Sequence, residues 1–336
     1  MKMLLIVAAA GLTIGLTACS QNEEPKSADK EKEVVEQSGK DEETESEKQT
    51  EDKMAIASNE FFEPFNGKID HIHGVGYAGD QGAPFYAAHD GLKVFEDGKW
   101  FKTKKQNNDY MGFNATQDGF YSSGHPGEDS DLPNPIGIQK STDNGQTLES
   151  LVLEGEIDFH IMGVGYENKA IFVQNPHGNS LMEAEKFYLS ENNTDTWQEM
   201  NANGLQDEII SVAVHPQKTD YLAAAGQQGI YLSEDKGSHF EKITNGGQGT
   251  SVFFTNESLI YGSYQDGTPR LVKLSLDDGV ETEIPLPKMK EDAVMYFAQN
   301  PKNKQEMTFT TFNGNIFFTE DGGSSWDLMV EAGNLK

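Results

Sequence analysis

One eight-residue segment constrains the fold of this chain more than any other. Residues 319–326 read T-E-D-G-G-S-S-W, and related segments occur at 233–240 (S-E-D-K-G-S-H-F), 141–148 (S-T-D-N-G-Q-T-L) and, in degenerate form, 190–197 (S-E-N-N-T-D-T-W). The pattern suits a tight hairpin, because the aspartate accepts backbone N–H groups, the glycine supplies positive φ and the aromatic ring packs back on the strands. The residues predicted to build these turns are Asp143, Gly145, Asp235, Gly237, Asp321, Gly323 and Trp326.

The rest of the chain alternates short runs rich in Val, Ile, Phe, Tyr and Thr with turns of Gly, Asn and Asp, a pattern typical of antiparallel strands. The runs form six groups of four, at residues 71–104, 110–153, 159–200, 209–243, 250–284 and 293–330. Units of this length are typical of propeller blades. We therefore predict an all-β fold, a β-propeller with six blades of four antiparallel strands. The alternative of seven blades requires residues 61–68 to contribute to another blade, for which they look too short.

The repeated turn resembles the Asp-box (BNR) repeat of sialidase-like and sortilin-like β-propellers, and the resemblance covers residues 57–336. In that family the box is a structural turn at the blade periphery, away from the active site, so it informs on fold and not on chemistry. Bacterial lipoproteins of this kind are often labelled glycosyl hydrolases. Resemblance to sialidases would also require a triad of arginines to clamp the substrate carboxylate. The sequence has one arginine, Arg270, which argues against classical sialidase activity.

The amino terminus reads as a secretion signal. Lys2 precedes an apolar run, Met3 to Leu16, that is short for a membrane span. The run ends in Leu-Thr-Ala-Cys, which resembles a bacterial lipobox; this implies cleavage before Cys19, lipidation of its thiol (palmitate) and anchoring to the cell membrane. The alternatives are an ordinary signal peptide or a buried helix. Cys19 is the sole cysteine, which excludes an intrachain disulfide, a cysteine metal site and a cysteine nucleophile elsewhere.

A strongly acidic segment follows. Residues 21–53 have no aromatic side chain and are predicted to form a disordered tether, so we expect a signal peptide at 1–18, a tether at 19–56 and the propeller at 57–336. Residues 21–53 hold 13 acidic residues and 6 lysines, a net charge of about −7, and with Lys2 at +1 the remaining domain carries about −23 of the total −29. This charge argues against nucleic acid and anionic lipid as partners.

Six of the eight histidines map to one rim of the predicted propeller. The first strands of blades one to three begin with matching positions, and the period-two alternation of a strand puts each pair on one side: His71 and His73, Asp109 and Met111, His160 and Met162. The second strands of these blades end in His89, His125 and His177, on the same rim. The other two histidines, His215 and His239, fall at a bottom turn and in a repeated hairpin.

Imidazole, thioether and carboxylate together form a ligand set that suits copper, with zinc as the other candidate. We therefore predict a metal or polar-ligand site at His71, His73 and His160, with the remaining rim residues as further ligands. The alternative is that each histidine packs and bonds backbone, and that Met111 and Met162 fill the core. The insertion at 124–135 extends a loop on this rim, and its acidic residues could cover the site or supply oxygen ligands.

Two function classes remain open. The first is a membrane-anchored, monomeric, extracytoplasmic propeller that binds a small ligand, a metal ion or a protein on the histidine-rich face. The second is a glycoside hydrolase acting on an extracellular glycan with two carboxylates. Clustered histidines without paired catalytic motifs favour binding. The available carboxylates for the hydrolase are Asp70, Glu128, Asp129, Asp131 and Asp158. No glycine-rich nucleotide loop, G-x-S-x-G elbow or H-E-x-x-H motif is present.

Overall fold

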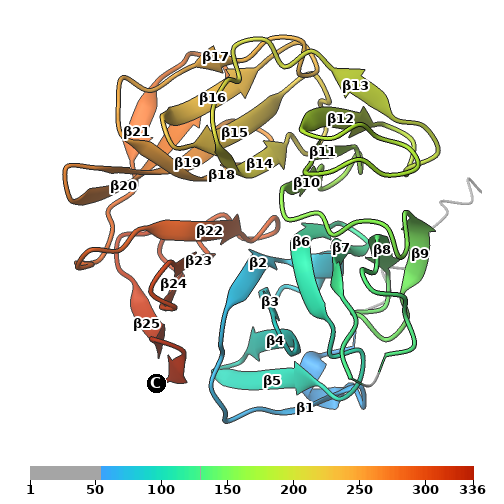
Figure 1. Cartoon of the computed structure of the whole chain (residues 1–336). Coiled ribbons are helices and arrows are strands. Elements are labelled where there is room, and N and C mark those ends of the chain that lie inside the picture. The colour runs from blue at the N-terminus through green and yellow to red at the C-terminus, as the bar shows by residue number, and fades with distance from the viewer. Residues whose placement is uncertain (1–53, 129) are drawn as a thin grey trace, which may run out of the picture. The chain divides into compact units, whose positions relative to one another are not determined.

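The computed structural model describes residues 54–128 and 130–336, which form six antiparallel sheets around a common centre (Figure 1). The prediction of a six-bladed β-propeller is confirmed, and the seven-bladed alternative is wrong. The two helices in this part of the chain are single 3₁₀ turns, η1 (Ile56–Ser58) and η2 (Ala78–Asp80). Neither has the length or apolar character that a bilayer span demands. The predicted signal peptide, Cys19 and nearly all of the tether lie outside the described residues.

Each blade contains four consecutive strands, and blades one and six carry a fifth at their outer edge. Blade one consists of β1 (Phe62–Pro64), β2 (Ile72–Gly76), β3 (Phe85–Ala88), β4 (Gly91–Glu96) and β5 (Lys99–Thr103). Blade two consists of β6 (Asp109–Thr116), β7 (Gly119–His125), β8 (Ile138–Ser141) and β9 (Glu149–Val152). Blade three consists of β10 (Met162–Val164), β11 (Ile171–Asn175), β12 (Lys186–Ser190) and β13 (Gln198–Met200).

Blade four consists of β14 (Ile209–Val214), β15 (Leu222–Gly226), β16 (Gly229–Ser233) and β17 (Glu241–Lys242). Blade five consists of β18 (Gln248–Phe254), β19 (Ser258–Gln265), β20 (Thr268–Ser275) and β21 (Glu281–Glu283). Blade six consists of β22 (Val294–Gln299), β23 (Met307–Thr311), β24 (Ile316–Thr319), β25 (Asp327–Glu331) and β26 (Asn334–Leu335). The innermost strand of each blade faces the centre, and each of these inner strands, β2, β6, β10, β14, β18 and β22, contacts the next around the ring, including β22 with β2 (Figure 1).

Apolar side chains between neighbouring blades form the core. Phe172 and Leu189 of blade three pack with Val212 and Leu222 of blade four in one buried cluster. Blade one begins before its predicted boundary, because Ile56 is fully buried in the cluster between blades one and two. These side chains recur at alternate positions because successive residues of a strand point to opposite faces.

The repeated turns have the geometry that their sequence predicts. Asp321 Oδ1 accepts the N–H of Ser325 at 2.9 Å, and Thr319 Oγ1 accepts the N–H of Gly323 at 3.2 Å. Gly323 has a φ of +84°, which is costly for a residue with a Cβ atom. Trp326 packs against Phe309 with the ring centroids 4.7 Å apart. The corresponding turns of blades two, three and four repeat both hydrogen bonds, with Asn192 and Thr194 replacing the aspartate and glycine in blade three.

The ring closes between blades one and six. A β-bridge joins Lys68 to Asn334, and the N–H of Ile69 donates to the carbonyl of Gly333 at 2.8 Å. Residues 61–68, too short for a seventh blade, supply β1, which pairs with β5 at the outer edge of blade one. The chain termini of the domain therefore meet on one interface and hold its first and last blades together.

Candidate metal centre

Strand starts and ends place the rim histidines beside two aspartates. Asp109 is the first residue of β6 and His125 is the last residue of β7, and the two are direct partners across the strand pair. His89 follows β3 directly, next to the start of β2. The His89 ring lies 5.0 Å from the ring of His71 and 4.7 Å from the ring of His73, measured between centroids. His73 of β2 and His71, which directly precedes β2, therefore both face His89, although a register shift interrupts β2 between Ile72 and Gly74.

The first group consists of His73, His89 and Asp109. His73 Nε2 lies 3.5 Å from Asp109 Oδ1, and His89 Nδ1 lies 3.5 Å from Asp109 Oδ2. One ligand atom from each of the three residues lies within 4.8 Å of the other two. Two ligands bound to one ion at about 2.1 Å with tetrahedral angles are about 3.4 Å apart. Each nitrogen–oxygen separation is therefore close to that of two ligands of one ion, although His73 and His89 face different oxygens of the Asp109 carboxylate.

Two polar atoms of this group are buried without hydrogen bonds. The side chains of His73 and Asp109 are each only 16% exposed. Neither His73 Nε2 nor Asp109 Oδ1 has a hydrogen-bond partner among the residues that the structure describes. A buried polar atom that lacks a partner pays the cost of losing water without recovering it. A bound cation would satisfy both atoms at once.

Burial also sets the protonation of the group. It lowers the pKa of His73 to about 4, helped by the neighbouring charges of His89, His160 and His71 and opposed by Asp158. Burial raises the pKa of the Asp109 carboxyl, while the positive charges of the surrounding histidines oppose that shift. At neutral pH His73 is therefore uncharged, and an uncharged imidazole is the form that binds a metal.

The second group consists of Asp158, His125 and His160. Asp158 Oδ2 lies 3.2 Å from His125 Nε2 and 2.6 Å from His160 Nε2. The short contact raises the pKa of His160, with burial opposing it. Asp158 Oδ1 is buried and has no hydrogen-bond partner within the described part of the chain. The N–H of Phe159 donates to Ser123 Oγ at 2.9 Å, which fixes this segment of blade three against β7.

His71 occupies a strained backbone conformation beside the first group. Its φ is +42°, a region that side chains with a Cβ atom adopt at a cost of about 1–3 kcal/mol. His71 is exposed, in contrast to His73. Strain of this kind persists only where the surrounding structure imposes it. Here it keeps a third imidazole next to His89.

The remaining predicted ligands differ in position. Met111 is buried and lines a space shared with His73 and His160, whereas Met162 is buried along the axial cavity. His177 belongs to neither group: it lies exposed in the connection between β11 and β12, where its carbonyl accepts the Asn175 side-chain amide at 2.7 Å. His215 is buried in a turn and its Nδ1 accepts the N–H groups of Gln217 and Lys218.

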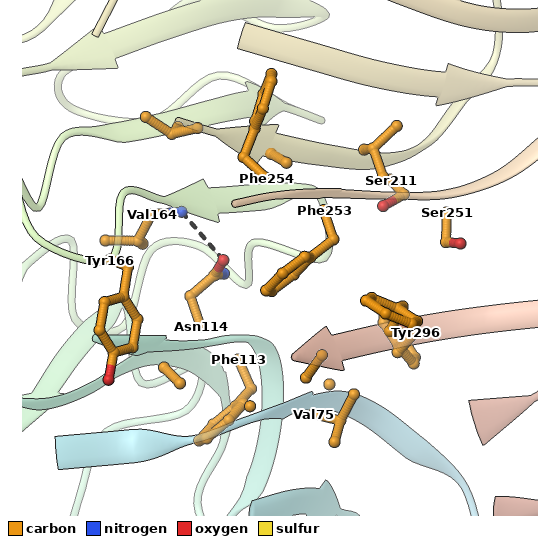
Figure 2. Close-up of a pocket in the computed structure, with 18 of the residues that line it drawn as sticks. Val75, Phe113, Asn114, Val164, Tyr166, Ser211, Ser251, Phe253, Phe254 and Tyr296 are labelled. Atoms are coloured by element: carbon orange, nitrogen blue, oxygen red, sulfur yellow. Dashed lines mark hydrogen bonds between the residues drawn. The ribbon is translucent and has the colours of Figure 1, made fainter. Parts of the chain in front are cut away.

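The axial cavity opens from the same centre. It has a volume of about 240 Å³, and residues of all six inner strands line it, with His73 and His160 among them. Figure 2 shows part of its wall, where Phe113, Phe253 and Tyr296 lie together with polar side chains such as Asn114 and Ser251. Asn114 Oδ1 accepts the N–H of Val164 at 3.0 Å, which ties β6 to β10 across the wall (Figure 2). The two histidine groups therefore border an apolar space on the propeller axis.

Asp158 enters the centre as a ligand candidate that the sequence had offered only as a hydrolase carboxylate. A signal was present, because Asp158, His160 and Met162 alternate with a period of two. Asp70 instead pairs with Lys68 in an exposed position. Arg270, the single arginine, lies exposed on β20 with its Nε 3.4 Å from Glu283 Oε1. It stands in a peripheral strand and does not line the axial cavity.

Comparison with known proteins supports the β-propeller fold and nothing more specific. No protein-family model and no curated protein matches the chain. A chain of the nidogen/laminin complex is similar at 10% identity and a TM-score of 0.53, over 73% of this chain and 92% of that chain. The tricorn protease has 11% identity and a TM-score of 0.53, over 80% of this chain and 27% of that chain.

A GH74 xyloglucanase from Xanthomonas campestris has 14% identity and a TM-score of 0.49, over 80% of this chain. The chain spans less than half the length of this xyloglucanase and of an ancestral GH74 enzyme, 46% and 40% respectively. At these identities a likeness extends to architecture only. The chain is a β-propeller protein with a histidine–aspartate centre beside its axial cavity.

Proposed function

We propose that this protein is a metal-binding β-propeller that holds a divalent transition-metal ion between His73, His89 and Asp109. One observation carries the proposal: ligand atoms of three residues lie within 4.8 Å of one another, and two atoms of the group, His73 Nε2 and Asp109 Oδ1, are buried without hydrogen bonds. Structural histidines normally have such bonds, as His215 does. A cation at this position would supply the contact that these two atoms lack.

Zn(II) and Cu(II) fit the donor set better than Cu(I) does. Two imidazole nitrogens and a carboxylate oxygen are borderline-to-hard ligands, whereas Cu(I) prefers thiolate and thioether sulfur. His73 supplies an uncharged imidazole at neutral pH, and Asp109 supplies the compensating negative charge. Three protein ligands leave a fourth position of a tetrahedral ion open, which is typical of sites that exchange or act on a ligand. The exposed His71 lies near enough to His89 to approach that position.

We also propose that lipidation of Cys19 anchors the protein to the cell membrane on its extracytoplasmic side, on the basis of the lipobox-like Leu16–Cys19 segment. Metabolic labelling with a palmitate analogue tests this. The label is expected on the wild-type chain and absent from Cys19→Ala, and a labelled Cys19→Ala chain would contradict the proposal. The glycoside hydrolase alternative depends on resemblance of fold, which carries no activity.

Metal binding is tested on the full chain purified without a histidine tag. After treatment with chelator and dialysis, Zn(II) and Cu(II) are titrated by isothermal calorimetry against a competing chelator. We expect the affinity of the wild type to fall at least about 100-fold in the His73→Gln/His89→Gln variant, because ligand loss exceeds the effect of outer contacts. His239→Gln is the matched control, since His239 lies exposed in a repeated turn beside Asp235. Equal affinity in all three proteins would refute the proposal.

A further inference from the structure

The centre contains a second set of the same donors. His125, His160 and Asp158 are two imidazoles around one carboxylate, as are His73, His89 and Asp109, and the two groups share no residue. The register pair Asp109 and His125 makes them neighbours. We propose that this second group holds a second divalent transition-metal ion, so that the centre binds two ions beside each other. This inference builds on the proposed function and adds a position to it.

The orientation of His125 supports a cation at this position. His125 Nδ1 lies 2.7 Å from Asn134 Oδ1, and because an amide oxygen only accepts hydrogen bonds, Nδ1 carries the proton. In the uncharged ring Nε2 then presents a lone pair to Asp158 Oδ2 at 3.2 Å. Two acceptors at that distance repel each other unless a proton or a metal ion lies between them. A hydrogen bond that fixes the tautomer from behind is the usual support of a metal-binding histidine.

The position and burial of the Asp158 carboxylate suit a metal ligand. Its side chain is 13% exposed, Oδ2 faces both imidazoles and Oδ1 is buried without a partner in the described residues. The 3.2 Å separation from His125 Nε2 is close to the roughly 3.4 Å expected for two ligands of one ion. Asn134 belongs to the insertion at 124–135, so the described part of that loop supplies an outer contact of the second position.

His160 must move to complete the set, because the ligand atoms of this group do not all lie within the 4.8 Å of one another that holds for the first group. Its Nε2 is 2.6 Å from Asp158 Oδ2, a distance that fits a shared proton and is short for two ligands of one ion. The side chain is 60% exposed and is therefore able to turn. On binding, the proton between Nε2 and Asp158 leaves that nitrogen for Nδ1 or for solvent, and the metal takes its place. The greater exposure of this group predicts weaker binding than at the first position.

Metal stoichiometry tests the inference. The full chain, stripped of metal, is dialysed against buffered Zn(II), and the bound ion is measured by mass spectrometry. We expect two equivalents in the wild type and in His239→Gln, and one in both His125→Gln/His160→Gln and His73→Gln/His89→Gln. The variant lacking all four histidines should bind none. Circular dichroism confirms that each variant is folded.

The outcomes separate the two proposals. One equivalent in the wild type that is lost only with His73 and His89 would overturn the second position and leave the proposed function standing. One equivalent lost only with His125 and His160 would overturn the proposed first position instead. Complete loss of zinc in both double variants would show a single ion shared by the two groups, and the two-ion inference would be wrong.

Discussion

Asp109 and His125 are partners across neighbouring strands, yet their side chains belong to different groups. The Asp109 carboxylate lies between His73 and His89, whereas His125 Nε2 faces Asp158. The start of β6 and the end of β7 thus deliver one residue to each half of the centre. Two carboxylates then lie among five imidazoles, an arrangement whose polar atoms are only partly satisfied.

Replacement of Asp109 should separate metal affinity from stability. Asp109→Asn keeps the shape of the side chain and removes its charge, so we expect Zn(II) affinity to fall at least about 100-fold. The metal-free protein should be as stable as the wild type or more stable, because burial disfavours the ionised carboxylate. Calorimetric titration and thermal unfolding of the metal-free protein measure the two effects. A variant that loses stability and keeps its affinity would assign Asp109 a purely structural role.

His73 should make the metal-free protein sensitive to acid. Its pKa is about 4 in the folded chain and about 6.5 in the unfolded chain, so the unfolded state binds more protons between these values. The stability that the uncharged ring provides is complete above pH 6.5 and is lost as the pH falls towards 4. The slope is about 1.4 kcal/mol per pH unit. The free energy of unfolding is measured in urea at several pH values for the metal-free wild type and for His73→Gln. It should fall more steeply with decreasing pH in the wild type than in the variant. The same pH dependence in both proteins would contradict this role of His73.

The repeated turns made the fold predictable, because their chemistry is local. Ser or Thr, Asp and Gly lie within five residues, so the hydrogen bond from the N–H of Gly237 to Ser233 Oγ, and its counterparts in other blades, follow from the sequence itself. These turns set the blade register and hence the six-bladed count. Strand alternation then predicted that His71 and His73 face one side, and both rings do lie beside His89.

The membership of each group could not be predicted in the same way. His177 occupies the sequence position that corresponds to His89 and His125, but β11 ends at Asn175, whose amide holds the following chain by the carbonyls of His177 and Glu183. The chain therefore turns away from the histidine-rich rim before it reaches His177. His160 is a local partner of Asp158, but the other partner, His125, comes from the end of β7, so this group depends on a contact between blades that no local pattern contains.

A buried hydroxyl in a repeated turn should contribute more to the free energy of unfolding than an exposed one. Ser233 is buried, accepts the N–H of Gly237 at 2.9 Å and donates to Asp235 at 3.0 Å. Ser233→Ala leaves that N–H unsatisfied and should destabilise the fold by about 1–3 kcal/mol. Ser324→Ala, at an exposed position of another turn, should stay within about 0.5 kcal/mol. Chemical denaturation compares them, and metal affinity should be unchanged in both; equal costs would contradict this account of the turn.

The last prediction concerns closure of the ring. Tyr86 of blade one and Thr308 of blade six, 222 residues apart in sequence, are fully buried and share a 2.8 Å hydrogen bond between hydroxyls. Thr308→Val should destabilise the protein by about 1–3 kcal/mol, because it leaves the Tyr86 hydroxyl buried without this partner. Adding Tyr86→Phe removes the stranded group, so the double variant should recover part of the loss. Urea unfolding of both single variants and the double variant measures the coupling. Strictly additive effects would show that this contact does not help to join the first and last blades.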